Sequence, residues 1–415
     1  DAATYSIAGT WGGSFADDTA RLFLSASYYN RGTASANSRT TGEADAGTST
    51  PTSGLLVQNR SNLFGLPAAN ARYLAYRNLF LNTYGTALPS LASSYLVNLD
   101  GTILSSQGGL NLRDTATTGY NITETGQVRQ RFDNDSTLYL PLDRYTGFAR
   151  GEFDISDSIT AYAQLNYATY STDQLSSQGV TQSVVEPVTI SAANPFITPD
   201  LRVLLNSRPN PNGPITYYFN TGRLGRLRVQ QDYDVWQGLL GFKGQLTDNL
   251  FFDLYASYGR TDQDATALNQ VSRSRFLQVV NAPDGGRSLC DGGYDPFGFA
   301  PASASCQEYL TFSTTDRNSY EQKIVQGTIT GDLFELPGGT AGFAIGGEYR
   351  ENSYVVDIDP RNSPTPTSVP GVTTAPETFG TSGARSTRGD LNVKEVYAEL
   401  LLPLLSDTQF FERLE

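Results

Sequence analysis

Amphipathic strands joined alternately by short polar turns and long loops are the feature that most constrains this chain. The short connections are Ser14–Asp18, Ser156–Ser158, Thr247–Asn249, Pro337–Gly339 and Ser406–Thr408. Each lies beside runs in which apolar and polar residues alternate, the pattern of a β-strand with one apolar face. The long connections cover residues 32–142, 173–224, 264–319 and 358–388. In an antiparallel up-and-down sheet, all the short turns therefore lie at one end and all the long loops at the other.

The alternating runs predict four hairpins and a ninth strand, at about 4–13 and 19–31, 143–155 and 159–172, 226–246 and 249–263, 321–335 and 340–357, and 390–405. These strands are longer than the usual ~5–6 residues of globular proteins. A membrane strand needs ~9–11 residues, and Tyr, Phe and Trp recur near the strand ends, as they do at membrane interfaces. The fold class predicted is all-β, an antiparallel up-and-down transmembrane β-barrel with short periplasmic turns and long extracellular loops. A soluble β-sandwich or propeller stays as the alternative, because alternation does not distinguish lipid from a packed core.

Composition excludes several classes of function. No run approaches the ~20 apolar residues of a spanning helix. The formal charge of −13 argues against nucleic acid as a partner. The chain has no His, which removes the commonest general base and metal ligand. We therefore predict no enzyme activity, no cofactor and no metal site. Residues 133–136 (Asp-Asn-Asp-Ser) offer oxygen ligands for calcium without the spacing of a known loop, and a solvated turn explains them better.

The two cysteines, Cys290 and Cys306, lie within one long loop. In an oxidising compartment they are expected to form a disulfide, which would stabilise the fold by ~3 kcal/mol. Two free thiols are the alternative. The absence of Met and of a signal peptide suggests a mature or internal piece of a longer product. A short loop helix is predicted to begin at Thr198-Pro199-Asp200, with Pro near the first helical position.

Several stretches resemble the barrel strands of TonB-dependent outer-membrane receptors, most closely those of sphingomonad or caulobacter type. They cover nearly the whole chain in order and are residues 140–145, 153–163, 193–196, 275–298, 320–322, 331–339, 347–350 and 396–404. The resemblance implies a 22-stranded barrel around an N-terminal plug that contacts TonB. About nine strands are visible and no plug is found, so residues 1–415 are expected to be the N-terminal half of such a barrel. An open half sheet is not tolerated in a bilayer, so further strands must complete it.

The resemblance further implies energised uptake of a large, scarce ligand across the outer membrane of a Gram-negative bacterium. The ligand would be a ferric siderophore, a vitamin or a glycan oligomer, and the partners would be outer-membrane lipid or lipopolysaccharide and, through the plug, TonB. Loop aromatic residues would stack on ligand rings and loop arginines would bind carboxylates. The candidates are Tyr73, Tyr76, Tyr84, Tyr120, Arg129, Arg131, Tyr217, Tyr218 and Arg223. Packing among the loops is the simpler role for each.

Charged residues on the polar side of the strands would contact the plug or, more simply, pair across strands. They are Arg150, Glu152, Lys243, Glu348, Arg350, Glu395 and Glu399. Two other classes of function stay open. A passive porin shares the strand pattern but usually has shorter loops. A soluble β-rich adhesin or surface protein would also explain the Thr- and Ser-rich composition.

Overall fold

The computed structural model describes residues 2–35, 48–49, 57–58, 69–87, 94–105, 108–113, 115, 120–131, 137–175, 187–218, 224–298, 301–368, 373–381, 383–406, 409 and 412–415. Within these residues, one large sheet contains nine antiparallel strands that pair in chain order. They are β1 (Thr4–Phe15), β2 (Ala20–Arg31), β11 (Leu142–Ser156), β12 (Ile159–Leu175), β15 (Arg228–Thr247), β16 (Leu250–Val271), β17 (Thr311–Leu336), β18 (Gly339–Asp357) and β21 (Thr387–Leu401). The predicted all-β, up-and-down antiparallel fold is confirmed.

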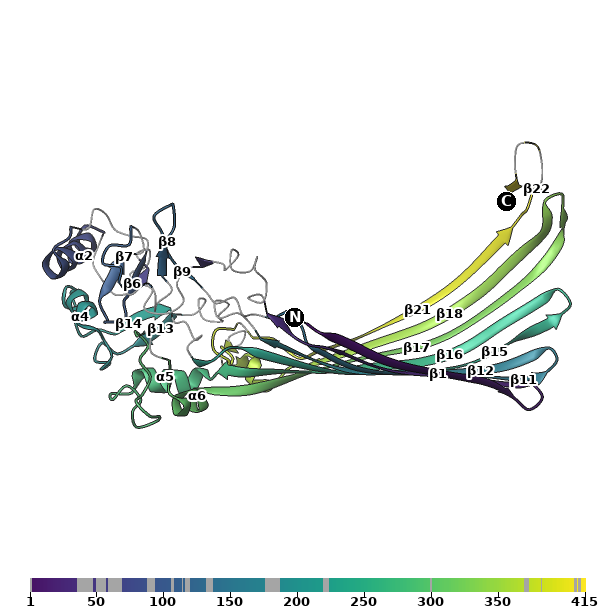
Figure 1. Cartoon of the computed structure of the whole chain (residues 1–415), viewed down its shortest axis with the longest axis horizontal. Helices are drawn as coiled ribbons and strands as arrows, with labels where there is room; N and C mark the ends of the chain where they lie inside the picture. Colours follow the sequence, from purple (N-terminus) through teal and green to yellow (C-terminus); the bar gives the residue numbers. More distant parts are fainter. Residues whose placement is uncertain are drawn as a thin grey trace.

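The sheet is long and curved, with the short turns at one end and the loops gathered at the other (Figure 1). We call these the turn end and the loop end. The first turn places Ala16, Asp17 and Asp18 at positive φ, a region that Asp adopts more readily than most residues. Within the described residues, no helix is both long enough and apolar enough to cross a membrane.

The strand boundaries correct the sequence prediction in two places. β16 continues to Val271 and β17 begins at Thr311, so this loop covers 272–310 rather than 264–319. The extra segments alternate weakly, but they pair with each other along most of their length. The last strand ends at Leu401 rather than at 405, because Pro403 has no N–H to donate to the sheet. The predicted last turn lies partly outside the described residues, beside the short pair β22 (Leu405–Ser406) and β23 (Arg413–Leu414).

The loops contain their own helices and small sheets. The helical elements are α2 (Ala69–Tyr84), α4 (Pro199–Asn206), α5 (Arg273–Asn281), α6 (Ala304–Leu310) and the 3-10 turn η3 (Pro360–Asn362). The short strands are β3 (Ala34–Ser35), β4 (Thr48–Ser49), β5 (Val57–Gln58), β6 (Ser94–Val97), β7 (Ile103–Ser105), β8 (Tyr120–Ile122), β9 (Val128–Arg131), β10 (Thr137–Tyr139), β13 (Pro187–Ile190), β14 (Ile215–Tyr218), β19 (Thr365–Pro366) and β20 (Thr373–Thr374). Helix α4 confirms the predicted loop helix, with Thr198 as N-cap accepting a hydrogen bond from the Leu201 N–H.

One apolar core joins all four long loops. It brings together Phe80 from the first, Leu204 from the second, Phe276 from the third and Phe379 from the fourth. A smaller core lies between β6, β7, β8 and β9 and contains Leu96, Leu104, Tyr120 and Val128. We call the described loop elements around these cores the loop assembly. It lies beyond the loop end of the sheet (Figure 1).

Candidate functional site

The two faces of the large sheet differ in chemistry. On one face the side chains are mostly aliphatic or aromatic toward the turn end, and many are exposed to solvent. Leu240 is 56% exposed and Val396 is 91% exposed. We call this the apolar face and the opposite side the polar face. Side chains this apolar do not usually gather on a water-facing surface, so the apolar face requires an apolar environment outside the chain.

The apolar face has a sharp boundary toward the loop end, marked mostly by aromatic residues. Strand by strand from β2 to β21, the boundary residues are Tyr28, Tyr145, Tyr167, Trp236, Tyr258, Val325, Tyr349 and Val396. Two residues further toward the loop end, the same face carries polar or charged residues, among them Asp143, Asp234, Arg260, Lys323 and Lys394. Neighbouring boundary rings touch, with ring centres 4.7 Å apart for Tyr28 and Tyr145 and 4.9 Å apart for Trp236 and Tyr258.

This boundary crosses the strands obliquely. Tyr28 and Tyr145 are paired directly across β2 and β11. The same line of directly paired residues, continued from strand to strand, reaches β21 at Arg388. The boundary on β21 lies at Val396, eight residues away after seven steps from strand to strand. With a rise of ~3.3 Å per residue and ~4.8 Å between strands, this stagger corresponds to a strand tilt of roughly 40°. Membrane barrels tilt their strands by about 35–45°.

The width of the apolar region agrees with the same interpretation. On β15 it runs from Trp236 to Leu246, and on β16 it runs from Tyr258 to Leu250. These lengths match the ~9–11 residues that a tilted strand needs to cross the hydrocarbon of a bilayer. The apolar face therefore fits a flat apolar layer at a single angle across eight strands.

The polar face is charged near the turn end. Glu152 accepts hydrogen bonds from Arg150 at 2.9 Å and from Lys243 at 3.0 Å, and Arg21 lies 3.7 Å from the same carboxylate. Glu348 and Glu395 are direct cross-strand neighbours, and Arg350 is 3.4 Å from Glu348. Six of the seven charged residues singled out from the sequence are thus cross-strand neighbours or in ion pairs. Contact with a plug is untested.

Tyrosines on this face lie over glycines of the neighbouring strand. A Cβ at Gly241 would be 2.4 Å from the Tyr162 ring, and one at Gly346 would be 2.3 Å from the Tyr397 ring. Each tyrosine reaches across the glycine, Tyr162 donating to Asp253 at 2.5 Å and Tyr397 bonding Thr328 at 2.5 Å. The glycines here are required by side-chain packing.

On the polar face of β12, β15, β16, β17 and β18, three consecutive rows of paired residues carry no charged side chain; they lie between Arg350 on the turn side and Asp316 on the loop side. We call this region the amide–tyrosine surface. Its polar members are Tyr170, Asn166, Tyr233, Gln237, Gln263, Asn318, Tyr320, Gln322, Tyr354 and Asn352, and Ala168, Val235, Thr261, Gly259 and Val356 lie between them.

Hydrogen bonds hold the amide groups of this surface in place. Gln263 donates to the Tyr233 hydroxyl at 2.6 Å and accepts from Asn318 at 2.9 Å. Asn352 accepts from Tyr320 at 2.9 Å and from Gln322 at 3.0 Å. The Tyr170 and Tyr233 rings stack with centres 4.5 Å apart. The surface is therefore an ordered array of amide groups and aromatic rings.

The loop assembly buries two of the tyrosines proposed as ligand contacts. Tyr76 is 1% exposed and stacks on Tyr95 with ring centres 3.9 Å apart. Tyr120 is 2% exposed within the smaller core. Tyr84 donates to the Asp200 carboxylate, and burial together with this bond raises the pKa of Tyr84. In this arrangement the three side chains hold the loops together.

The structure leaves the other proposed ligand contacts open. Tyr73 lies in α2, Arg129 and Arg131 lie in β9, and Tyr217 and Tyr218 lie in β14, but their side chains are outside the described set. Arg223 lies outside the described residues, as do residues 133–136. Ligand contact by any of these residues stays a prediction. Among the described residues, no three His, Cys, Asp or Glu side chains gather as a metal site would require.

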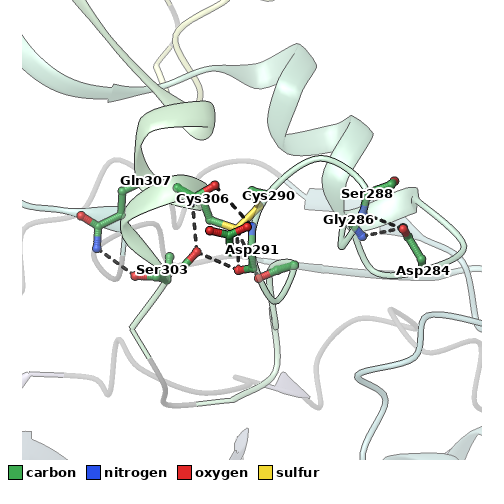
Figure 2. The surroundings of a disulfide bond; sticks show 11 residues. Asp284, Gly286, Ser288, Cys290, Asp291, Ser303, Cys306 and Gln307 are labelled. Carbon is green, nitrogen blue, oxygen red and sulfur yellow. Dashed lines mark hydrogen bonds between the residues drawn. A yellow bond between two sulfur atoms is a disulfide. The ribbon is translucent and has the colours of Figure 1, made fainter.

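Cys290 and Cys306 form a disulfide, with Cα atoms 4.9 Å apart (Figure 2). Cys306 lies in the first turn of α6, where the N-cap Ser303 accepts from its N–H at 3.2 Å and donates to Asp291 at 2.8 Å. In the same loop, Asp284 accepts from the N–H groups of Gly286 and Ser288 (Figure 2). The disulfide thus ties this loop to the start of β17 within the larger core.

Carboxylates attach the fourth loop to its neighbours. Asp359 accepts two bonds from the Arg361 guanidinium, one from the Arg361 N–H and one from the Thr315 N–H, and the Arg361 guanidinium is the main cause that lowers the pKa of Asp359 to about 2. Burial of Glu377 raises its pKa, but bonds from Ser272 and Ser274 outweigh this, so that the pKa is lowered overall. Both groups are therefore ionised wherever the loop assembly is intact at neutral pH.

Sequence reasoning missed the amide–tyrosine surface. The signal was present as Asn, Gln and Tyr at alternate positions of five strands. It gains meaning only when the register places those positions side by side.

No protein-family model matches the chain, and no curated protein matches it. Similar solved structures include the siderophore receptor PiuA from Acinetobacter baumannii, at 12% identity and a TM-score of 0.35, covering 96% of this chain and 39% of that one. The ferric-catecholate import receptor Fiu from E. coli K12 matches in its closed form at 12% identity and 0.33, and in its open form at 11% and 0.29, again over 96% of this chain. This chain spans about two fifths of those receptors, 39–43% of their length. At these values, the likeness carries no functional inference.

Proposed function

We propose that this chain forms part of the barrel of a TonB-dependent outer-membrane receptor that takes up a large, scarce ligand in a Gram-negative bacterium. The oblique apolar region with its aromatic boundary carries the proposal. A water-soluble sheet has no reason to keep one flat apolar layer at a constant angle across eight strands. Lipid imposes that layer.

The remaining features fit the same function. The loops lie beyond the aromatic boundary, at the end that would face outward, and they form an assembly with its own core. The polar face would line the lumen, where Glu348 and Glu395 would meet a plug from another part of the protein. Uptake driven by TonB, and the sphingomonad or caulobacter subtype, rest on the sequence resemblance.

Fluorescence quenching by brominated lipids tests the membrane placement, because the chain has only two tryptophans. Trp236 is at the boundary, and Trp11 lies on the apolar face closer to the turn end. In Trp11→Phe protein reconstituted in vesicles, we expect Trp236 to be quenched best by bromines near the headgroups. In Trp236→Phe protein, we expect Trp11 to be quenched best by deeper bromines. A protein that stays soluble without detergent and shows no quenching contradicts the proposal.

The mass of the intact polypeptide extracted from its native membrane tests the receptor claim. A mass near twice this chain's 45.0 kDa is expected for a complete barrel with its plug. A detergent-extracted protein with no plug segment would support a passive pore instead.

A further inference from the structure

We propose that the amide–tyrosine surface binds a neutral, hydroxyl-rich oligomer, an uncharged oligosaccharide, on its way between the loops and the turn end. This inference rests on the proposed function, because it takes the polar face to line the transport path. It selects one ligand class among the siderophore, vitamin and glycan alternatives.

The first reason is the absence of charge. The surface consists of three rows of directly paired residues that run across five adjacent strands. None of the three rows contains Asp, Glu, Lys or Arg. Of the arginines that border the surface, Arg150 bonds Glu152 at 2.9 Å, Arg350 lies 3.4 Å from Glu348, and Arg144, the register partner of Tyr170 on β11, lies over the Tyr29 ring. An anionic ferric chelate would be expected to meet free cations on such a path.

The second reason is the pairing of functional groups. Asn and Gln side chains both donate and accept hydrogen bonds, as sugar hydroxyls do. Tyrosine rings add flat apolar faces beside polar edges. Tyr320 is 43% exposed, and its hydroxyl is held by Asn352 at 2.9 Å, so that its ring is oriented before any ligand arrives.

The third reason is the contrast with the other face at the same level. There, β15, β16, β17 and β18 carry Asp234, Arg260, Glu321 and Glu351. Charge is therefore common at this height of the sheet and is missing from the polar face of these five strands. Five strands at ~4.8 Å spacing span roughly 19 Å, enough for several sugar rings side by side.

Calorimetric titration of the full-length protein in detergent tests the proposal. The probes are maltohexaose, cellohexaose and xylohexaose, with hexagalacturonate and ferric citrate as anionic counterparts. We expect at least one neutral hexasaccharide to bind and neither anionic probe to compete. Tyr320→Ala should weaken that binding by roughly tenfold, the scale of an aromatic contact of about 1.5 kcal/mol.

Matched variants separate recognition from folding. Tyr320→Phe keeps the ring and should bind within about threefold of the unsubstituted protein, which is the result expected if stacking dominates. Tyr258→Ala removes a tyrosine from the apolar face of the adjacent strand and should leave binding unchanged. An equal loss in Tyr320→Ala and Tyr258→Ala would mean general destabilisation and would overturn the proposal.

The remaining outcomes are distinguishable from failure of the proposed function. If ferric citrate or hexagalacturonate binds and no neutral hexasaccharide does, the ligand class is wrong while a receptor role stands. If none of the neutral probes binds at millimolar concentration, the inference is also overturned. Membrane placement is measured separately by tryptophan quenching, so neither result depends on it.

Discussion

The large sheet and the loop assembly use similar apolar residues in opposite ways. In the sheet, Leu240 and Val396 are exposed, and no layer of the described residues covers them. In the loop assembly, Phe80, Phe276 and Phe379 are almost completely buried in a core shared by four loops. The loop assembly has the arrangement of a protein surrounded by water, in which apolar side chains are buried in a core. The apolar face has the arrangement expected where the surroundings are themselves apolar.

The largest effect is expected for a substitution that destabilises the loop assembly and leaves the large sheet unchanged. Phe276→Ala removes a side chain with 0% exposure that packs against Phe379 and Tyr294, and it should destabilise the loop assembly by about 3–5 kcal/mol. Leu277→Ala, one residue further along α5 and 37% exposed, is the matched control and should cost far less. Hydrogen exchange should show the loss within the loops. An equal loss of protection in β15 and β16 would contradict the separation drawn here.

A charge placed on the apolar face should harm the sheet in its membrane and leave the loop assembly unchanged. Leu240→Arg lies midway along the apolar region of β15 and should cost about 2–4 kcal/mol in the bilayer. Asp234→Arg is on the same strand and face beyond the aromatic boundary, where the expected cost is only about 0–1 kcal/mol. Unfolding in lipid vesicles measures both. Equal costs would mean that the boundary at Trp236 is not a membrane interface.

Within the sheet, packing is expected to matter on the polar face and not on the apolar face. Gly241→Ala drives a Cβ into the Tyr162 ring and should cost about 1–3 kcal/mol. Gly147→Ala is the control, because a Cβ there meets nothing within 4 Å. It should be neutral or stabilise the sheet by up to about 1 kcal/mol, since Gly weakens strands. Denaturant unfolding of the two variants compares them, and a costly Gly147→Ala would reveal a close neighbour on the apolar face.

The smallest effect concerns pH and the attachment of the fourth loop. The carboxyl of Asp359 has a pKa of about 2 in the fold against an ordinary value of 3.8. A lowered pKa means that the ionised form stabilises the fold, fully above about pH 4, and that this contribution is lost as the pH falls toward 2. Exchange of the Thr315 amide, corrected for its intrinsic rate, should accelerate across this window. Asp359→Asn should remove that pH dependence, and persistence of the dependence would assign it to another group.

Much of the architecture could be predicted from alternation and turn chemistry. Period-two patterns such as Phe252, Leu254 and Ala256 against Asp253 and Tyr255 are local, so they identify strands and their two faces without any partner. Thr198-Pro199 identified the start of α4 for the same reason. Strand ends were less certain where alternation faded, as in residues 264–271, because pairing with 311–319 extends those strands.

The candidate sites were less predictable because they depend on contacts distant in sequence. From the sequence, Tyr76 and Tyr120 are predicted to be loop aromatic residues available to a ligand. In the structure, Tyr76 is buried against Tyr95, and Tyr120 is buried in the small core that contains Leu96. The amide–tyrosine surface combines single residues from five strands, none of which stands out in its own segment.

The sequence by itself determined which residues form strands, which side of each strand is apolar and which connections are long, since these follow from spacing and turn residues along a few positions. The tertiary structure decided the register, and with it the oblique line from Tyr28 to Val396, the uncharged surface around Tyr320 and the shared core of the loops. The physical reason is that side-chain alternation repeats within one strand, whereas register is set by hydrogen bonds and packing between segments far apart in the chain.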